Sequence, residues 1–259
     1  MDLPAWIEVT LFAAVTAVAT GFGALPFLVV RNMSKRVQAL ATAVAAGAML
    51  GASFGLIMEG FSANGVRVAD AVGGGAWRTL LGAASGIAVI TLMRRFLPSG
   101  DQVGVAELRG VDARRALVVI AVMTMHSAAE GVGGGVAFGD TVEFGLFITA
   151  AIAIHNIPEG LAISAVMVPS GTPVWKAALW SVFSSVPQPL LALPAFLFVE
   201  AFSWWLPVGL GFAAGAMVWM VIAELLPESF EDASPNAASL AAGAGFAGML
   251  ALQVALSVG

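Results

Sequence analysis

The only two histidines of this 259-residue chain each open the same spaced pattern inside a hydrophobic segment. His126 is followed four residues later by Glu130, and His155 is followed four residues later by Glu159. A spacing of four places the two members of each pair on one face of a helix. Imidazole nitrogens and carboxylate oxygens together suit Zn²⁺, Fe²⁺, Mn²⁺ and similar ions. The four side chains are therefore candidate ligands for one divalent metal ion.

The composition is that of an integral membrane protein. Charged residues make up 10% of the chain, whereas an ordinary soluble domain has about 25%. The absence of cysteine excludes disulfides and thiolate metal sites. No basic run resembles a nucleic-acid-binding patch, so the expected partners are the lipid bilayer and metal ions and not nucleic acid. Ionisable groups in the middle of a membrane segment are costly to keep, which favours a functional interpretation of the two His/Glu pairs.

Eight hydrophobic runs are long enough to cross about 30 Å of hydrocarbon. They predict one all-α transmembrane domain over residues 1–259, with spans near residues 6–30, 37–58, 77–97, 116–138, 144–168, 174–199, 204–226 and 237–258. The polar segment 98–115 is predicted to be a loop. In this arrangement nine lysines and arginines fall on one side of the membrane and two on the other. The positive-inside rule then predicts a multi-pass protein of the cell (plasma or inner) membrane with both termini outside the cytoplasm.

The predicted spans place both His/Glu pairs near the centre of the bilayer. His126 lies ten residues into the fourth span and His155 eleven residues into the fifth. At 1.5 Å per residue these positions are about 15 and 16 Å deep, in opposite directions. The two pairs can therefore face each other on neighbouring antiparallel helices. Two glutamates also cancel the formal charge of one divalent ion, and an uncompensated buried charge is costly.

Three further polar residues lie at similar depth. Ser127 and Asn156 follow the two histidines directly, and Gln188 lies mid-span between two prolines. Those prolines predict a break or kink in the sixth span, and Pro158 predicts a local one in the fifth. Ser127 and Gln188 are either neighbours of the metal or residues that join helices by hydrogen bonds.

A five-residue match indicates an inverted repeat. Ala45–Met49 in the second span recurs as Ala213–Met217 in the seventh, which runs in the opposite direction. Inverted repeats are common in transporters; a chance match in a chain rich in Ala and Gly is the alternative. Both copies are followed by acidic residues near the span ends, which are either solvated or line an entrance or exit: Glu59, Glu224 and Glu228.

These motifs resemble those of the ZIP (Zrt/Irt-like) divalent metal transporters, of the bacterial type. The segment His155-Asn-Ile-Pro-Glu159-Gly160 is similar to the family's H-N-x-P-E-G motif. Ala213–Met217, followed by Glu224-Leu-Leu-Pro-Glu228, is similar to the family's penultimate helix. The resemblance implies eight helices in a 3+2+3 arrangement and a homodimer. It also implies import of Zn²⁺, or else Fe²⁺, Mn²⁺ or Cd²⁺, by alternating access, with the ion as cargo, no cofactor and no enzymatic activity.

The resemblance also implies roles for the polar residues of the spans. A primary site would consist of His126, Glu130, His155 and Glu159, and a second subsite sharing both glutamates would add Ser127, Asn156 and Gln188. The family commonly has Asn and Pro where this chain has Ser127 and Ala129, and many bacterial relatives have Glu in place of Gln188. These differences predict one firmly held ion beside a weak or empty second position. Helices one, four, five and six would slide against helices two, three, seven and eight.

Two other functions could use the same residues. An intramembrane metalloenzyme is one, although the H-E-x-x-H and E-x-x-H signatures are absent from the chain. A proton or cation channel is the other, in which Glu130 and Glu159 would relay protons without firm metal binding. The sequence leaves open the identity of the ion, the driving force, the occupancy of the second subsite and the oligomeric state.

Overall fold

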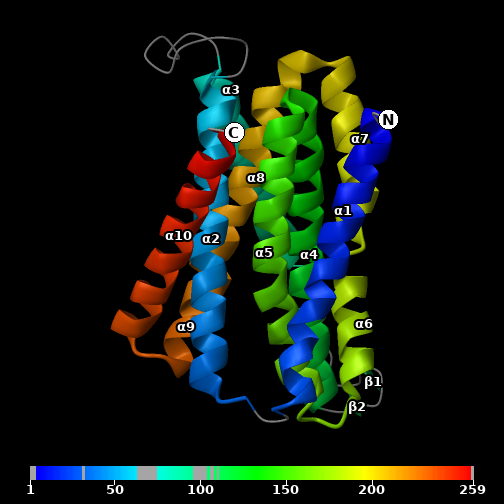
Figure 1. Ribbon diagram of the computed structural model, residues 1–259, viewed down its shortest axis with the longest axis vertical. Coiled ribbons are helices and arrows are strands. Elements are labelled where there is room, and N and C mark those ends of the chain that lie inside the picture. The colour runs from blue at the N-terminus through cyan, green and yellow to red at the C-terminus, as the bar shows by residue number, and fades with distance from the viewer. Residues whose placement is uncertain are drawn as a thin grey trace.

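Long helices aligned along one axis make up almost all of the structure (Figure 1). The structure is a computed structural model and describes residues 4–30, 33–62, 75–95, 104–105, 108–109 and 111–257. Two short strands, β1 (Gly104–Val105) and β2 (Leu108–Arg109), pair in an antiparallel hairpin. The predicted all-α class is confirmed, with this hairpin as the one extended element among the described residues.

The helices reproduce the eight predicted spans. The first four spans correspond to α1 (Ala5–Gly21) with the 3-10 helix η1 (Phe22–Leu28), α2 (Lys35–Ser62), α3 (Ala76–Arg94) and α4 (Val111–Asp140). The fifth span corresponds to α5 (Val142–Met167), and the sixth to α6 (Val174–Ser184) followed by α7 (Pro187–Ala201). The seventh span consists of η3 (Ser203–Trp205), α8 (Leu206–Met220), η4 (Val221–Leu225) and α9 (Leu226–Asp232). The last span is α10 (Pro235–Ser257). Seven of these stretches are long and apolar enough to cross a membrane. The eighth, α4, has 30 residues and is about 45 Å long, which is also sufficient.

Some helix ends differ from the predicted ends. Helix α4 begins at Val111, so the end of the predicted loop 98–115 is helical, and the hairpin also lies within that loop. The seventh span continues through α9 to Asp232 instead of ending near residue 226. Hydropathy locates the apolar part of a helix, but backbone hydrogen bonds continue into polar turns beyond it.

The prolines act differently in the sixth and fifth spans. The sixth span is broken, as predicted: α6 ends at Ser184 and α7 begins at Pro187, which puts Gln188 in the first turn of α7. A proline is well tolerated there because the first N–H groups of a helix have no partner within it. Pro158, in contrast, lies inside α5, and a break at this position does not occur.

The helices form two groups whose main contacts are between two pairs of helices. The first, which we call the site group, consists of α1, α4, α5, α6 and α7; the second, the frame group, consists of α2, α3, α8, α9 and α10. The groups meet mainly where α2 packs on α5 and where α8 packs on α4, with smaller contacts of α10 with α5, α3 with α4 and α7 with α8. This division matches the two sets of helices that the family resemblance implies.

The pairing of helices has the symmetry of an inverted repeat. Helix α2 packs on α10 as α8 packs on α3, and α5 packs on α1 as α4 packs on α7. The repeated pentapeptide has the same role in both halves. A Cβ atom on Gly47 would lie 1.8 Å from the carbonyl oxygen of Ala242 in α10, and one on Gly215 would lie 2.2 Å from that of Ala83 in α3. Each glycine lets two helices approach closely.

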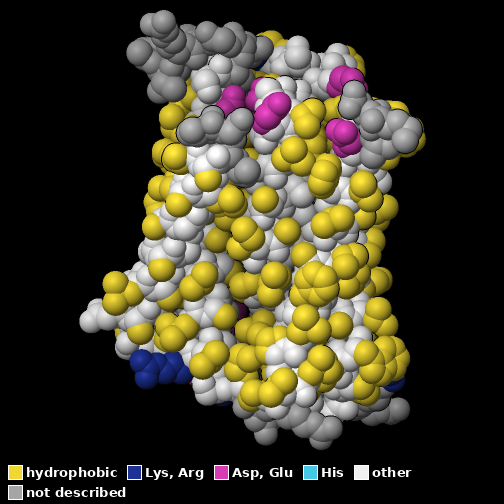
Figure 2. Space-filling model, viewed as in Figure 1, with side chains coloured by type: hydrophobic (Ala, Val, Ile, Leu, Met, Phe, Trp, Pro, Cys, Tyr) yellow, Lys and Arg dark blue, Asp and Glu magenta, His cyan; other side chains and the backbone are white. Residues whose placement is uncertain are grey.

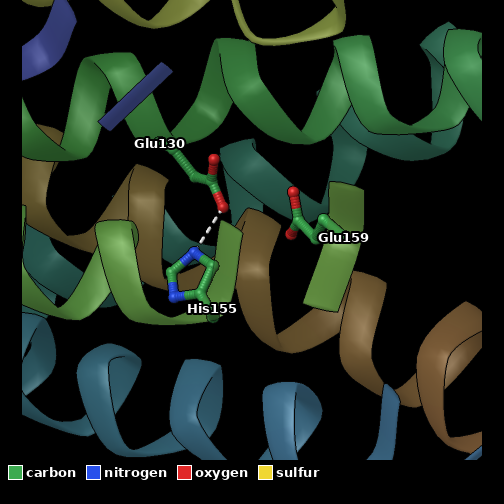
Figure 3. Close-up of side chains that lie close together, drawn as sticks. All are labelled: Glu130, His155 and Glu159. Carbon is green, nitrogen blue, oxygen red and sulfur yellow. Dashed lines mark hydrogen bonds and ion pairs between the residues drawn. The ribbon is translucent and has the colours of Figure 1, made fainter. Parts of the chain in front are cut away.

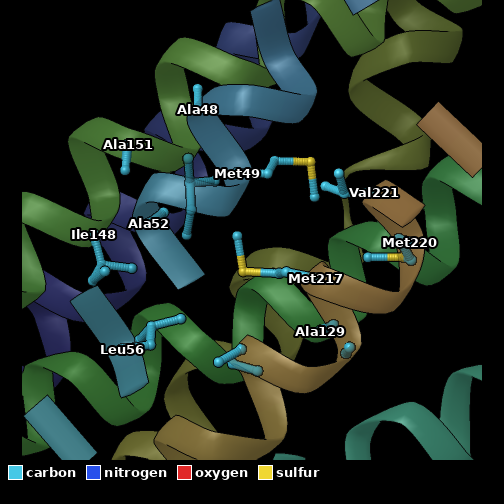
Figure 4. Packing of buried hydrophobic residues seen from close by; sticks show 14 of the residues in the cluster. Ala48, Met49, Ala52, Leu56, Ala129, Ile148, Ala151, Met217, Met220 and Val221 are labelled. Carbon is cyan, nitrogen blue, oxygen red and sulfur yellow. The ribbon is translucent and has the colours of Figure 1, made fainter. Parts of the chain in front are cut away.

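Small and flexible apolar residues fill the contact between the two groups (Figure 4). Ala48 and Ala52 of α2 face α5 near Ala151 and Ile148. A Cβ atom on Gly133 of α4 would lie 2.9 Å from the Cβ of Ala213 in α8. Alanines of α2 and α8 therefore lie in the surface that meets the site group.

Charged and apolar side chains are segregated along the long axis. Hydrophobic side chains cover the middle of the visible face, with acidic groups near its upper end and basic groups near its lower end (Figure 2). The helix directions place four described cations at the lower, basic end: Lys35, Arg36, Arg95 and Lys176. The start of α1 and the end of α10 lie toward the opposite end (Figure 1). This distribution fits a protein that crosses a bilayer along its long axis.

Candidate metal site

A tight connection makes the two His/Glu motifs face each other. Helices α4 and α5 are separated by one residue, Thr141, whose side-chain oxygen accepts a 3.1 Å hydrogen bond from the N–H of Phe144. This cap fixes the start of α5 directly after the end of α4. The two helices pack on each other as antiparallel neighbours. Side chains at matched depth therefore meet between them.

Three of the predicted ligands converge at this contact (Figure 3). One ligand atom from each of Glu130, His155 and Glu159 lies within 4.8 Å of the other two. The Nε2 of His155 lies 2.6 Å from Oε1 of Glu130, and both residues are fully buried. Donors on one tetrahedral zinc ion are roughly 3.4 Å apart, so an ion held by both residues would take the place of this hydrogen bond. The group has the size and the donor types of a divalent cation site.

Glu159 supplies a further argument for a cation. It is only 2% exposed, and neither carboxylate oxygen has a hydrogen-bond partner within the described part of the chain. A buried charge without a partner is strongly unfavourable. Figure 3 shows this carboxylate turned toward the space beside Glu130 and His155. A divalent ion in that space would satisfy both carboxylates at once.

Two predicted ligands lie outside this group of three. His126 is fully buried one turn before Glu130 on α4, but it is not a member of the group. Ser127 is also fully buried, and its Oγ lies 3.4 Å from Oγ of Ser185, which in turn lies 2.7 Å from Oγ1 of Thr20. Ser127 thus belongs to a cluster of hydroxyl groups that joins α4, α1 and the break between α6 and α7.

The remaining two predicted residues form a hydrogen-bond network beside Glu130. The Nε2 of Gln188 donates to Oε2 of Glu130 at 2.6 Å. The Nδ2 of Asn156 donates to Oε1 of Gln188 at 3.2 Å and to the carbonyl oxygen of Thr16 at 2.8 Å. The hydroxyl of Thr16 also donates to Oε1 of Gln188, at 2.7 Å. Sequence reasoning missed Thr16, because a threonine in an apolar helix carries no distinctive pattern.

The glycines that end both motifs are packing residues of the site. A Cβ atom on Gly131 would lie 2.5 Å from the carbonyl oxygen of Gln188, and one on Gly160 would lie 1.7 Å from that of Thr20. These glycines let α7 approach α4 and let α1 approach α5. The repeated Glu-Gly pair was visible in the sequence, but the partner helices were not.

A cavity lies between the site and the basic end of the molecule. It has a volume of about 250 Å³ and is bordered by α2, α5 and α9, with polar lining residues Lys35, Gln38, Thr42, Glu228 and Asp232. Lys35 Nζ lies 3.7 Å from Oδ1 of Asp232. Of the three glutamates predicted near span ends, Glu228 lines this cavity, Glu224 lies in the π-helical turn η4, and Glu59 lies near the other end of α2. On the acidic side of the site, Phe138 packs with Val9, Ala192 and Phe196 in an apolar cluster, and the cavity between this cluster and Glu130 has a volume of only about 10 Å³.

Comparisons with known proteins give a consistent result. Residues 99–253 match the family model described as ZIP zinc transporter. The chain is 34% identical to the zinc transporter ZIPB of Bordetella bronchiseptica, over 92% of this chain and 78% of that protein. It is 30% identical to the zinc transporter GufA of Myxococcus xanthus, over 93% of this chain and 95% of that protein. It is 44% identical to an Arabidopsis thaliana protein provisionally named a zinc transporter, over 95% of this chain, which spans 38% of that protein's length.

Proposed function

This chain belongs to the ZIP zinc transporter family, and we propose that it carries Zn²⁺ into the cytoplasm with the ion held by Glu130, His155 and Glu159. The family consists of transporters of divalent metal ions, so the chain is a multi-pass membrane transporter and not an enzyme. The ion is cargo, and each ligand must therefore bind it and also let it go.

One observation carries the choice of site: two carboxylates and an imidazole converge, fully or almost fully buried, in the middle part of two spans. Two negative charges match one divalent ion, which avoids a net charge inside the membrane. Nitrogen and oxygen donors without thiolates suit Zn²⁺ and also accept Fe²⁺, Mn²⁺ and Cd²⁺. His126, one turn from Glu130, would complete the set when the ion approaches it.

The direction of transport rests on the charges and on the cavity. Four described cations, Lys35, Arg36, Arg95 and Lys176, gather at the end of the molecule that the positive-inside rule assigns to the cytoplasm, whereas Arg78 lies at the other end. The cavity lies between Leu161, two residues after Glu159, and this end, whereas the Phe138 cluster lies on the opposite side. This arrangement corresponds to a transporter that faces inward, with its termini outside the cytoplasm. Zn²⁺ would leave past Glu228 and Asp232.

Alternating access would come from movement of the site group along the frame group. All three ligands lie on α4 and α5, so they move together and the site stays intact. The contact surface on α2 and α8 consists largely of alanine and methionine, which offers few projections that could lock it. The ion could then be exposed to each side in turn without contact with lipid.

Metal uptake into proteoliposomes tests this function. We expect saturable Zn²⁺ uptake by the wild-type protein and none by the His155→Ala/Glu159→Ala double variant, with Fe²⁺, Mn²⁺ and Cd²⁺ ranked in the same assay. Glu143→Gln is the matched control, because Glu143 is exposed at the start of α5. Uptake that persists in a folded double variant would contradict the assigned site. Proton flux without stoichiometric zinc binding would instead favour a channel.

A further inference from the structure

Gln188 uses both ends of its side-chain amide at the metal site. Its nitrogen donates to Oε2 of Glu130, and its oxygen accepts from the hydroxyl of Thr16 and from the amide of Asn156. The side chain is 1% exposed. The reverse orientation would turn the Gln188 oxygen toward a carboxylate and its N–H groups toward the N–H groups of Asn156. The network therefore defines which end of the amide faces Glu130.

We propose that the Gln188 amide, held by Thr16 and Asn156, takes the place of a second metal ion beside Glu130 and limits the site to one ion. This inference rests on the proposed function, since it concerns how many ions the same site holds. A carboxylate that bridges two ions needs both of its oxygens. Here Oε1 of Glu130 faces His155, while Oε2 is taken by an N–H donor.

The same hydrogen bonds also make the side-chain oxygen of Gln188 unavailable to a second ion. The oxygen is the one atom of the Gln188 side chain that can bind a metal ion, and it faces two donors on the side away from Glu130. In the described structure, Oδ1 of Asn156 is the one amide oxygen of this network without a hydrogen-bond partner. A single neutral oxygen does not compensate the charge of a second divalent ion.

Thr16 is in this scheme a positioning residue that acts through Gln188. Its single hydroxyl hydrogen is shared between Oε1 of Gln188 and the carbonyl oxygen of Ala13, at oxygen–oxygen distances of 2.7 and 2.8 Å. Its own carbonyl oxygen accepts from Asn156. Helix α1 therefore contributes to the site although it supplies no ligand to the ion.

The test is the number of zinc ions bound per protein. Purified full-length protein in detergent would be loaded with Zn²⁺, separated from free metal and analysed by elemental mass spectrometry and calorimetry. We expect one equivalent for the wild type and two for Gln188→Glu, which restores a carboxylate beside Glu130. Gln253→Glu introduces the same change on α10, where Gln253 packs near Gly55, and should leave one equivalent. Two equivalents in the wild type, or one in a folded Gln188→Glu variant, would overturn the proposal.

Variants of Thr16 separate positioning from mere packing. Thr16→Val removes the hydroxyl at nearly constant volume and should weaken the single zinc site about tenfold, the effect of one strong hydrogen bond. Thr16→Ser keeps the hydroxyl and should restore the affinity. Equal zinc affinities of the Thr16→Val and Thr16→Ser variants would argue against a positioning role of Thr16. If Gln188→Glu does not fold, the count is made on Gln188→Asp, which also places a carboxylate beside Glu130, and one equivalent in that folded variant would overturn the proposal. A wild-type count of one without transport would contradict the proposed function and leave this inference intact.

Discussion

Oε1 of Glu130 and Nε2 of His155 lie 2.6 Å apart across the contact between α4 and α5, and this hydrogen bond joins the two His/Glu motifs of the chain. It links a carboxylate from one motif to an imidazole from the other, so neither motif forms the site alone. Several measurable consequences follow from this arrangement and from the helices around it.

Replacing Glu159 should have opposite effects on zinc affinity and on the stability of the metal-free protein. Glu159→Gln removes a charged ligand and should lower zinc affinity at least about 100-fold, more than the loss of an outer-shell partner does. It also removes a buried carboxylate that has no hydrogen-bond partner in the described structure, so the melting temperature without metal should rise. Calorimetry with zinc and thermal unfolding in the presence of a chelator measure the two effects. A lower melting temperature would show that the carboxylate is stabilised in a way the structure does not display.

Enlarging a residue in the contact between the two helix groups should slow transport without abolishing metal binding. Ala48 of α2 is 3% exposed and lies near Ala151 of α5 (Figure 4). Ala48→Phe would place a ring in the surface along which the site group moves. The maximal uptake rate should fall while zinc affinity stays within about threefold of the wild type, because the three ligands are on α4 and α5. Ala88→Phe, at an exposed position on α3, is the control; an equal loss of binding would mean that Ala48 shapes the site itself.

Adding one methyl group at the end of the second motif should damage the fold. Gly160→Ala would place a Cβ atom 1.7 Å from the carbonyl oxygen of Thr20, which forces α1 away from α5. Overpacking of this kind costs about 1–3 kcal/mol, so the melting temperature should fall. Gly243→Ala is a matched control because a Cβ atom there meets no described atom within 4 Å, and helix propensity favours alanine. Equal melting temperatures for the two variants would show that α1 does not need this close approach.

The absence of cysteine from the chain makes single-cysteine labelling a clean test of orientation. Ala165→Cys lies in the lining of the cavity at the basic end, and Ser203→Cys lies at an exposed position at the other end. A membrane-impermeant maleimide should label Cys at position 203 in intact cells, and Cys at position 165 only in inside-out vesicles. Zn²⁺ should slow labelling at position 165 if the cavity is its release route. The reverse pattern of labelling would invert the proposed topology.

The local patterns of the sequence determined the helices and the depth of the site. Hydrophobic length sets how many spans there are, and a four-residue spacing places His155 and Glu159 on one face, because both depend only on helical geometry. The same local reasoning placed Gln188 at a helix break. It also found the repeat that begins at Ala45, although its packing role became clear only from the helix contacts.

The tertiary structure decided which of those side chains meet and what each one does there. The sequence put His126, Ser127, Asn156 and Gln188 at the right depth, but it could not say that Gln188 turns its nitrogen to Glu130 and its oxygen to Thr16. It contained no sign that Thr16, 172 residues before Gln188, would be its neighbour. The depth of a residue in the membrane and the helix face on which it lies follow from its position in the sequence and from helical periodicity. Contacts between helices that are distant in the sequence depend instead on how closely their backbones approach. That approach is controlled by glycines such as Gly131 and Gly160, whose partner helices become known only when the bundle is assembled.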